Sequence, residues 1–115
     1  MHELSLCQAV SSVVQRHSKG RAVSVVHLQV GAFRQVVPAT LVYSWEFVID
    51  STELEGSHLV VEQVPAVISC GDCGMLTTLS LPILVCGGCG SFNVVLISGE
   101  EFMVTSLELS ENARG

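Results

Sequence analysis

Residues 70–90 read CGDCGMLTTLSLPILVCGGCG and contain four of the chain's five cysteines. The pattern is C-x2-C, then twelve residues, then C-x2-C. Each pair presents two sulfurs on one side of a tight turn, and the glycines supply the backbone freedom that such a turn needs. Two facing turns place four sulfurs at the corners of a tetrahedron. The stretch predicts two metal-binding knuckles whose zinc ligands are Cys70, Cys73, Cys86 and Cys89.

Zinc is not the only interpretation of this cysteine pattern. Tetrahedral sulfur also holds iron, as in rubredoxin-like proteins, and the spacing does not exclude iron. Two disulfides would suit a secreted chain, but the first residues, MHELS, lack the basic region and apolar core of a signal peptide. We therefore expect the reducing environment of the cytoplasm, where cysteine clusters bind metal. Zinc is favoured over iron, and iron over disulfides.

The composition limits the remaining classes. A chain of 115 residues with 49% hydrophobic residues can bury one moderate core, or one core plus a small metal-stapled lobe. No apolar stretch is long enough to span a bilayer, since the longest candidate is interrupted by Pro82. The net charge is −6, and the five basic residues form no patch, which disfavours nucleic-acid binding.

Hydrophobic periodicity predicts a helix over residues 3–19 and a strand over 22–30. It then predicts a second helix from residue 38 onwards and a second strand over 58–64. The first helix is expected to bury a face made of Leu6, Val10, Val13, Val14 and His17. Pro38 suits the first turn of the second helix, where its missing N–H costs nothing. The strand–helix–strand order implies a parallel crossover.

The later part of the chain is predicted to return to the first sheet through a strand over residues 102–109. Residues 75–85, between the knuckles, are apolar and β-prone, and we expect a ribbon or hairpin packed over the metal. The predicted class is α+β, with two helices on a small mixed three-stranded sheet and an inserted zinc-ribbon-like β lobe. Residues 1–65 plus 99–115 would form an α/β lobe, and 66–98 a zinc-binding lobe.

The N-terminal tripeptide Met1-His2-Glu3 suggests a second metal site. If Met1 is the first residue, its amine, the His2 amide and the His2 ring nitrogen can close two chelate rings in one plane. Planar nitrogen donors suit Ni(II) or Cu(II). Glu3 could supply a further amide nitrogen or orient the site. Taken alone, a histidine at position 2 is more often an ordinary polar residue.

The other candidate residues favour structural roles. We expect Cys7 to be a small apolar core residue. The remaining histidines, His17, His27 and His58, carry no ligand pattern of their own. No catalytic arrangement of side chains is recognisable, so the chain is not expected to be an enzyme.

Several short motifs follow one another along nearly the whole chain. They are Met1-His2-Glu3, Val30-Gly31, Val37-Pro38, Leu54-Glu55-Gly56-Ser57, Val61-Glu62, the two cysteine pairs and Val104–Leu109. In this order they resemble the HypA family of [NiFe] hydrogenase nickel-insertion accessory proteins. The departures are Ala32-Phe33 and Ala39-Thr40, where the family commonly has acidic residues, and Gly87-Gly88, where it often has proline.

The resemblance implies a cytoplasmic metallochaperone. Ni(II) would be a transient cargo bound through Met1, His2 and Glu3, by backbone nitrogens and the His2 side chain. Zn(II) would be structural, held by the four paired cysteines. The implied partners are a HypB-type GTPase and the [NiFe] hydrogenase large subunit, with urease and its accessory proteins as a further route in some organisms. The alternative function is a zinc-ribbon interaction adaptor without nickel transfer.

Overall fold

The computed structural model describes residues 2–110, apart from the side chain of His2. The elements in chain order are α1 (His2–Ser18), β1 (Val23–Gly31), the 3-10 turn η1 (Ala32–Arg34), α2 (Pro38–Ile49), β2 (His58–Val64), β3 (Val67–Cys70), β4 (Leu76–Thr78), β5 (Val94–Ser98) and β6 (Phe102–Leu109). The strands form two three-stranded sheets, ordered β2-β1-β6 and β4-β3-β5. The predicted α+β class is confirmed.

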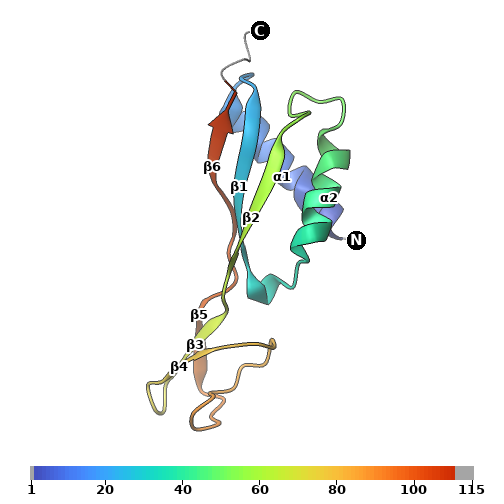
Figure 1. The fold of residues 1–115 in the computed structure, drawn as a ribbon. Helices are drawn as coiled ribbons and strands as arrows, with labels where there is room; N and C mark the ends of the chain where they lie inside the picture. The colour runs from blue at the N-terminus through green and yellow to red at the C-terminus, as the bar shows by residue number, and fades with distance from the viewer. Residues whose placement is uncertain (1, 111–115) are drawn as a thin grey trace. The chain divides into compact units, whose positions relative to one another are not determined.

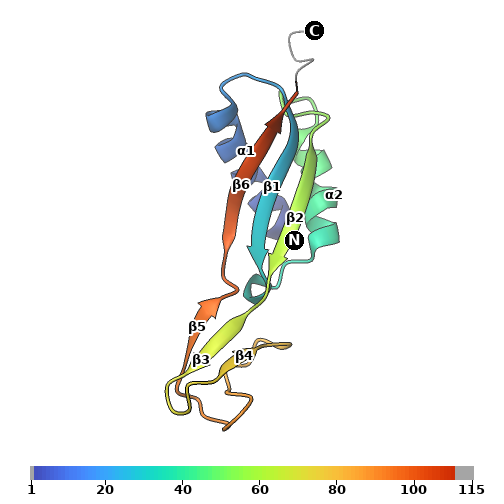
Figure 2. The same cartoon turned by 60° about the vertical axis from the view of Figure 1, so that its left-hand side comes forward.

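The first sheet is mixed and carries both helices on one face (Figures 1 and 2). The arrows of β1 and β2 point the same way, and that of β6 points the opposite way. A bond from the Ser110 amide to the Ala22 carbonyl, 2.9 Å long, closes the antiparallel β1–β6 pair at one end. The parallel β1–α2–β2 connection follows the prediction.

Alternation along β1 separates a buried face from a more exposed one, because successive side chains of a strand point in opposite directions. Val26, Leu28 and Val30 are buried. On α2, Leu41 and Trp45 are also buried, and the Trp45 indole nitrogen donates a 3.1 Å bond to the Ser57 hydroxyl. That bond satisfies the only polar atom of the largest buried side chain.

The buried face of α1 differs from the predicted one. It consists of Glu3, Cys7, Val10, Ser11, Val14 and Ser18. Leu6 and Val13 are only half-buried, and His17 is exposed, so the predicted face was wrong in part. Small side chains let α1 approach α2 closely.

A contact of Cys7 accompanies the burial of this face of α1. Its thiol donates a 3.3 Å bond to the Leu41 carbonyl on α2. Burial, followed by the nearby Glu3 carboxylate, raises the pKa of Cys7 to about 11. The thiol stays neutral, and Cys7 is the core residue that the sequence predicted.

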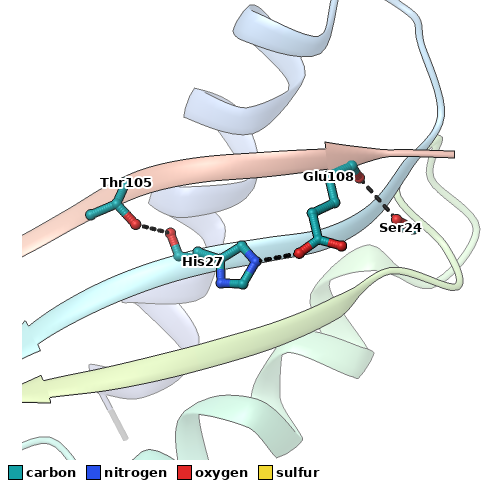
Figure 3. A network of polar contacts seen from close by, with 4 residues as sticks. All are labelled: Ser24, His27, Thr105 and Glu108. Atoms are coloured by element: carbon teal, nitrogen blue, oxygen red, sulfur yellow. Dashed lines mark hydrogen bonds and ion pairs between the residues drawn. The ribbon is translucent and has the colours of Figure 1, made fainter.

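The face of the first sheet away from the helices carries polar contacts that join β1 to β6 (Figure 3). His27 Nε2 lies 2.7 Å from a carboxylate oxygen of Glu108. The hydroxyls of Ser24 and Thr105 donate to the backbone carbonyls of Glu108 and His27 respectively. His27 therefore has a structural partner on the neighbouring strand.

The chain divides into two compact units, residues 1–29, 36–62 and 103–115 (unit 1) and residues 30–35 and 63–102 (unit 2). Segments 30–35, 63–65 and 99–102, which the sequence analysis assigns to the first lobe, lie in unit 2. A close backbone approach joins 30–35 to 99–102. The Gly31 amide donates to the Glu101 carbonyl at 2.7 Å, and the Phe33 amide donates to the Gly99 carbonyl at 2.8 Å.

Gly31 has no room for a side chain at this approach. A Cβ atom there would lie 2.0 Å from the carbonyl carbon and oxygen of Gly99. We expect Gly31→Ala to lower the free energy of unfolding by about 3 kcal/mol, because backbone atoms must move apart. Urea denaturation, monitored by circular dichroism, measures the loss in free energy of unfolding.

Gly56→Ala is the matched control, because the Gly56 Cβ position is open and only its φ of +92° is unfavourable. Its expected cost is about 1 kcal/mol. Equal losses for the two variants would contradict a steric role for the Gly31 approach.

Candidate metal centre

Four sulfurs from the two predicted knuckles converge in unit 2. The Sγ atoms of Cys70, Cys73, Cys86 and Cys89 all lie within 4.8 Å of one another. The Cys70–Cys89 and Cys73–Cys86 sulfur pairs are each 3.6 Å apart. A tetrahedral zinc ion with Zn–S bonds of about 2.3 Å would separate its sulfurs by about 3.8 Å. The four residues fit a structural zinc ion.

Disulfides do not form among these residues. All four are free cysteines, and their closest sulfur separations exceed the roughly 2.05 Å of an S–S bond. Tetrahedral iron would use the same sulfur arrangement.

The two knuckles share one backbone design. In the first, the Gly74 amide donates to the Cys70 carbonyl at 3.0 Å, and in the second, the Gly90 amide donates to the Cys86 carbonyl at 3.0 Å. Gly74 and Gly90 have φ values of +78° and +75°, a region that side chains disfavour. The glycine that follows each cysteine pair is therefore required by the turn itself.

Amide groups inside each turn point at the first sulfur. Cys70 Sγ accepts from the amides of Asp72 and Cys73, at 3.3 and 3.4 Å. Cys86 Sγ accepts from Gly88 and Cys89 at the same distances. These donors favour thiolate, the form that binds metal.

The ionisation of the four thiols is uneven. The Cys89 and Gly88 amides lower the pKa of Cys86 to about 6, and the Cys73 amide leads the causes that lower the pKa of Cys70. The pKa of Cys89 rises to about 12, since the neighbouring sulfurs outweigh the lowering effect of the Ser91 amide. Close sulfurs cannot all ionise unless a cation compensates their charge. A bound dication would supply that compensation.

Three polar side chains that the sequence analysis missed tie the knuckles together. The Asp72 carboxylate accepts a short hydrogen bond from the Ser91 hydroxyl and a 3.1 Å bond from the Asn93 side-chain amide. The Gly71 amide donates to the Asn93 carbonyl at 2.7 Å. The sequence signal for this link was an acidic residue inside the first cysteine pair and polar residues just after the second pair. Asp72 thus links the first turn to the chain leaving the second.

The segment between the knuckles differs from the predicted ribbon. Only β4 is a strand there, and Leu81, Ile83 and Leu84 are exposed rather than packed over the metal. Two bonds anchor the segment: the Thr77 hydroxyl accepts a 3.0 Å bond from the Gly87 amide, and the Leu79 amide donates a 2.8 Å bond to the Ala66 carbonyl. Beyond Leu79 the backbone makes tight turns, such as the bond from the Val85 amide to the Ile83 carbonyl at 3.0 Å.

The N-terminal candidates fall partly outside the described residues. This applies to Met1 and to the side chain of His2. Glu3 lies in the first turn of α1 and is 7% exposed. The other histidines belong to no metal cluster among the described residues.

Comparison with known proteins identifies the family to which this chain belongs. A family model described as "Hydrogenase/urease nickel incorporation, metallochaperone, hypA" matches residues 1–109. The hydrogenase maturation factor HypA of Geotalea uraniireducens is 37% identical over 109 residues, covering 95% of this chain and 99% of that protein. The factor of the same name from Geobacter sp. M21 is 38% identical with the same coverage. The chain belongs to the HypA family.

Solved HypA structures have the same fold. The solution structure of the Ni metallochaperone HypA from Helicobacter pylori superimposes with a TM-score of 0.66 at 24% identity, covering 95% of this chain and 97% of that one. HypA proteins bind nickel and act in hydrogenase maturation as metallochaperones, not as enzymes. No helix among residues 2–110 is long and apolar enough to cross a membrane.

Asp72→Ala tests the link between the knuckles. Loss of its two accepted bonds should weaken Zn(II) binding by about 10–100-fold, because groups that orient metal ligands contribute on this scale. Competition with a chromogenic chelator measures the affinity. Asp50→Ala, which removes an exposed acid after α2, should leave it unchanged. An Asp72 variant with wild-type affinity would mean that the four cysteines need no such link.

Proposed function

We propose that this chain captures Ni(II) at its N-terminus and delivers it to the [NiFe] hydrogenase large subunit. Met1, His2 and Glu3 would supply the ligands, through backbone nitrogens and the His2 ring. The zinc ion on Cys70, Cys73, Cys86 and Cys89 would be structural. Membership of the HypA family and the Met-His-Glu start support the assignment.

The nickel part of the proposal rests on where α1 begins. The helix begins at His2. Because the amides of the first turn have no acceptor four residues earlier in the helix, an amide there can lose its proton without breaking the i→i−4 ladder. The N-terminal amides are thus better suited to nickel than amides in the middle of an element.

Charge decides which ligands such a site needs. The N-terminus of a helix is the positive end of its dipole and disfavours cations. Deprotonated amide nitrogens offset this effect and, together with imidazole, favour a square-planar ion over zinc. A site of this kind binds nickel only while its nitrogens are free of protons.

We further propose that a HypB-type GTPase assists the transfer and that the protein works in the cytoplasm. Urease is a second client on the same grounds, because the description of the matching family names hydrogenase and urease together.

Metal analysis of untagged protein tests the two-site proposal. We expect one zinc per chain as purified, and about one further nickel after addition of Ni(II). The nickel, but not the zinc, should be lost in His2→Ala, because only the nickel site uses that imidazole. His58→Ala is the matched histidine control and should keep both metals.

Zinc without His2-dependent nickel would favour the alternative, a zinc-ribbon adaptor. Iron as the purified metal would overturn both interpretations.

An extension before Met1 provides an independent test. A single added residue converts the amine into an amide and should reduce nickel affinity at least tenfold, while the zinc content stays the same. Isothermal titration of the extended and untagged proteins gives the two affinities. Unchanged nickel affinity and stoichiometry would exclude the amine as a ligand.

A further inference from the structure

Met75 is a large apolar residue of unit 2 that contacts the second knuckle, although its side chain is 51% exposed. A Cβ atom built on Gly88 would lie 2.4 Å from the Met75 Sδ atom and 3.8 Å from the Cys86 Sγ atom. Because a Cα–Cβ bond is about 1.5 Å long, the Met75 sulfur lies within about 4 Å of the Gly88 Cα atom, in van der Waals contact. The thioether therefore rests on the turn between Cys86 and Cys89.

The backbone of Met75 is held by the first knuckle. Its carbonyl accepts a 3.0 Å hydrogen bond from the Cys70 amide. The main chain is thus fixed at one cysteine pair, while the side chain reaches the other. Two residues further on, the Thr77 hydroxyl accepts the bond from the Gly87 amide, and Thr77 Cγ2 would lie 3.1 Å from a Cβ atom on Gly87. Met75 and Thr77 therefore cover neighbouring glycines of one turn.

The covered turn contains the amides that point at the Cys86 sulfur. This sulfur accepts bonds of 3.3 and 3.4 Å from the Gly88 and Cys89 amides, and Cys86 is 2% exposed. Hydrogen bonds are electrostatically stronger away from water, so a cover that excludes water strengthens this pair of bonds. An unbranched, polarizable thioether adapts well to an irregular surface such as a glycine turn. Removal of the thioether would let water reach the amides and the sulfur.

Resting on the zinc site of the function proposed above, and independently of nickel, we propose that Met75 is a positioning residue for zinc. Its thioether holds the Gly87-Gly88 turn and shields the Cys86 sulfur, and so slows the loss of the metal. Zinc leaves a cluster of thiolates when water or a competing ligand replaces a sulfur, and the apolar shell of a metal site controls this access. Asp72 links the two knuckles through polar atoms, and Met75 links them through an apolar contact.

The rate of zinc release tests this role. Zinc-loaded protein is mixed with an excess of a chromogenic chelator, and the release is followed over time. We expect Met75→Ala to lose zinc about tenfold faster than wild type, because groups around a metal site contribute on this scale. Met75→Leu keeps the volume of the side chain and should stay within about twofold of the wild-type rate.

Met103→Ala is the matched control, because Met103 is 52% exposed and lies in unit 1. It should release zinc at the wild-type rate. Co(II) in place of zinc gives a second readout, since its absorption spectrum reports the geometry of the four sulfurs. The spectrum should change in Met75→Ala and return to that of wild type in Met75→Leu.

Gly88→Ala tests the contact between Met75 and the turn. Gly88 is not among the glycines with a positive φ, so its backbone accepts alanine. In the wild-type background the new methyl group must displace the Met75 sulfur, and we expect zinc release to become about fivefold faster. In the Met75→Ala background the same methyl group occupies the vacated place, 3.8 Å from the Cys86 sulfur, and should slow the release. This reversal of sign in a double-mutant cycle identifies a direct contact.

Several results would overturn the role of Met75. Equal release rates for wild type and Met75→Ala do so and leave the proposed function intact. A faster release that Met75→Leu does not restore also does so, because the bulk of the side chain would then not matter. If Met75→Ala does not fold, Gly88→Ala in the wild-type background decides, and an unchanged release rate there overturns the contact. Protein purified without zinc contradicts the proposed function itself.

Discussion

The convergence of four sulfurs is the constraint on which unit 2 depends. Within residues 63–102 the buried apolar side chains are few, and two of those that the structure describes are Cys70 and Cys86 of the four-cysteine cluster. So small a hydrophobic core does not offset the entropy of ordering the chain. A zinc ion held by four thiolates would supply the missing stabilisation, because such a site does not exist in the unfolded chain and its binding energy becomes folding energy. The amides that point at Cys70 and Cys86 prepare the sulfurs for this role.

The small size of unit 2 also leaves apolar residues on its surface. A three-stranded sheet of short strands has two faces, and only the one that carries Ile68 is buried. In unit 1, two helices cover one face of the sheet, and the opposite face carries polar contacts that join β1 to β6 (Figure 3). There, His27 and Glu108 join neighbouring strands without needing a core.

Some predictions from local sequence pattern were wrong because tertiary packing overrides that pattern. Periodicity placed His17 on the buried face of α1, but the Cys7 thiol bond to Leu41 accompanies a rotation that buries Ser11 and Ser18 instead. Short polar side chains read as surface in a sequence, yet they permit two helices to lie close together. Likewise, the β-prone run between the knuckles became mostly loop, because β3 finds its second partner in β5, far along the chain. Neither outcome has a signal within a short window of residues.

The sequence by itself determined two strands and the cysteine cluster: His58–Val64 and Phe102–Leu109 were predicted with the observed bounds, and the cysteine spacing alone selected the four sulfurs that lie together. These features are local, since alternation, a helix-opening proline and two glycine turns act over a few residues. Only the tertiary structure decided that Asp72 joins Ser91 and Asn93, that Gly31 meets Gly99, and that Leu76 and Val95 share one exposed face. Each of these relations links residues about twenty to seventy positions apart, so tertiary contacts, not local sequence pattern, bring them together.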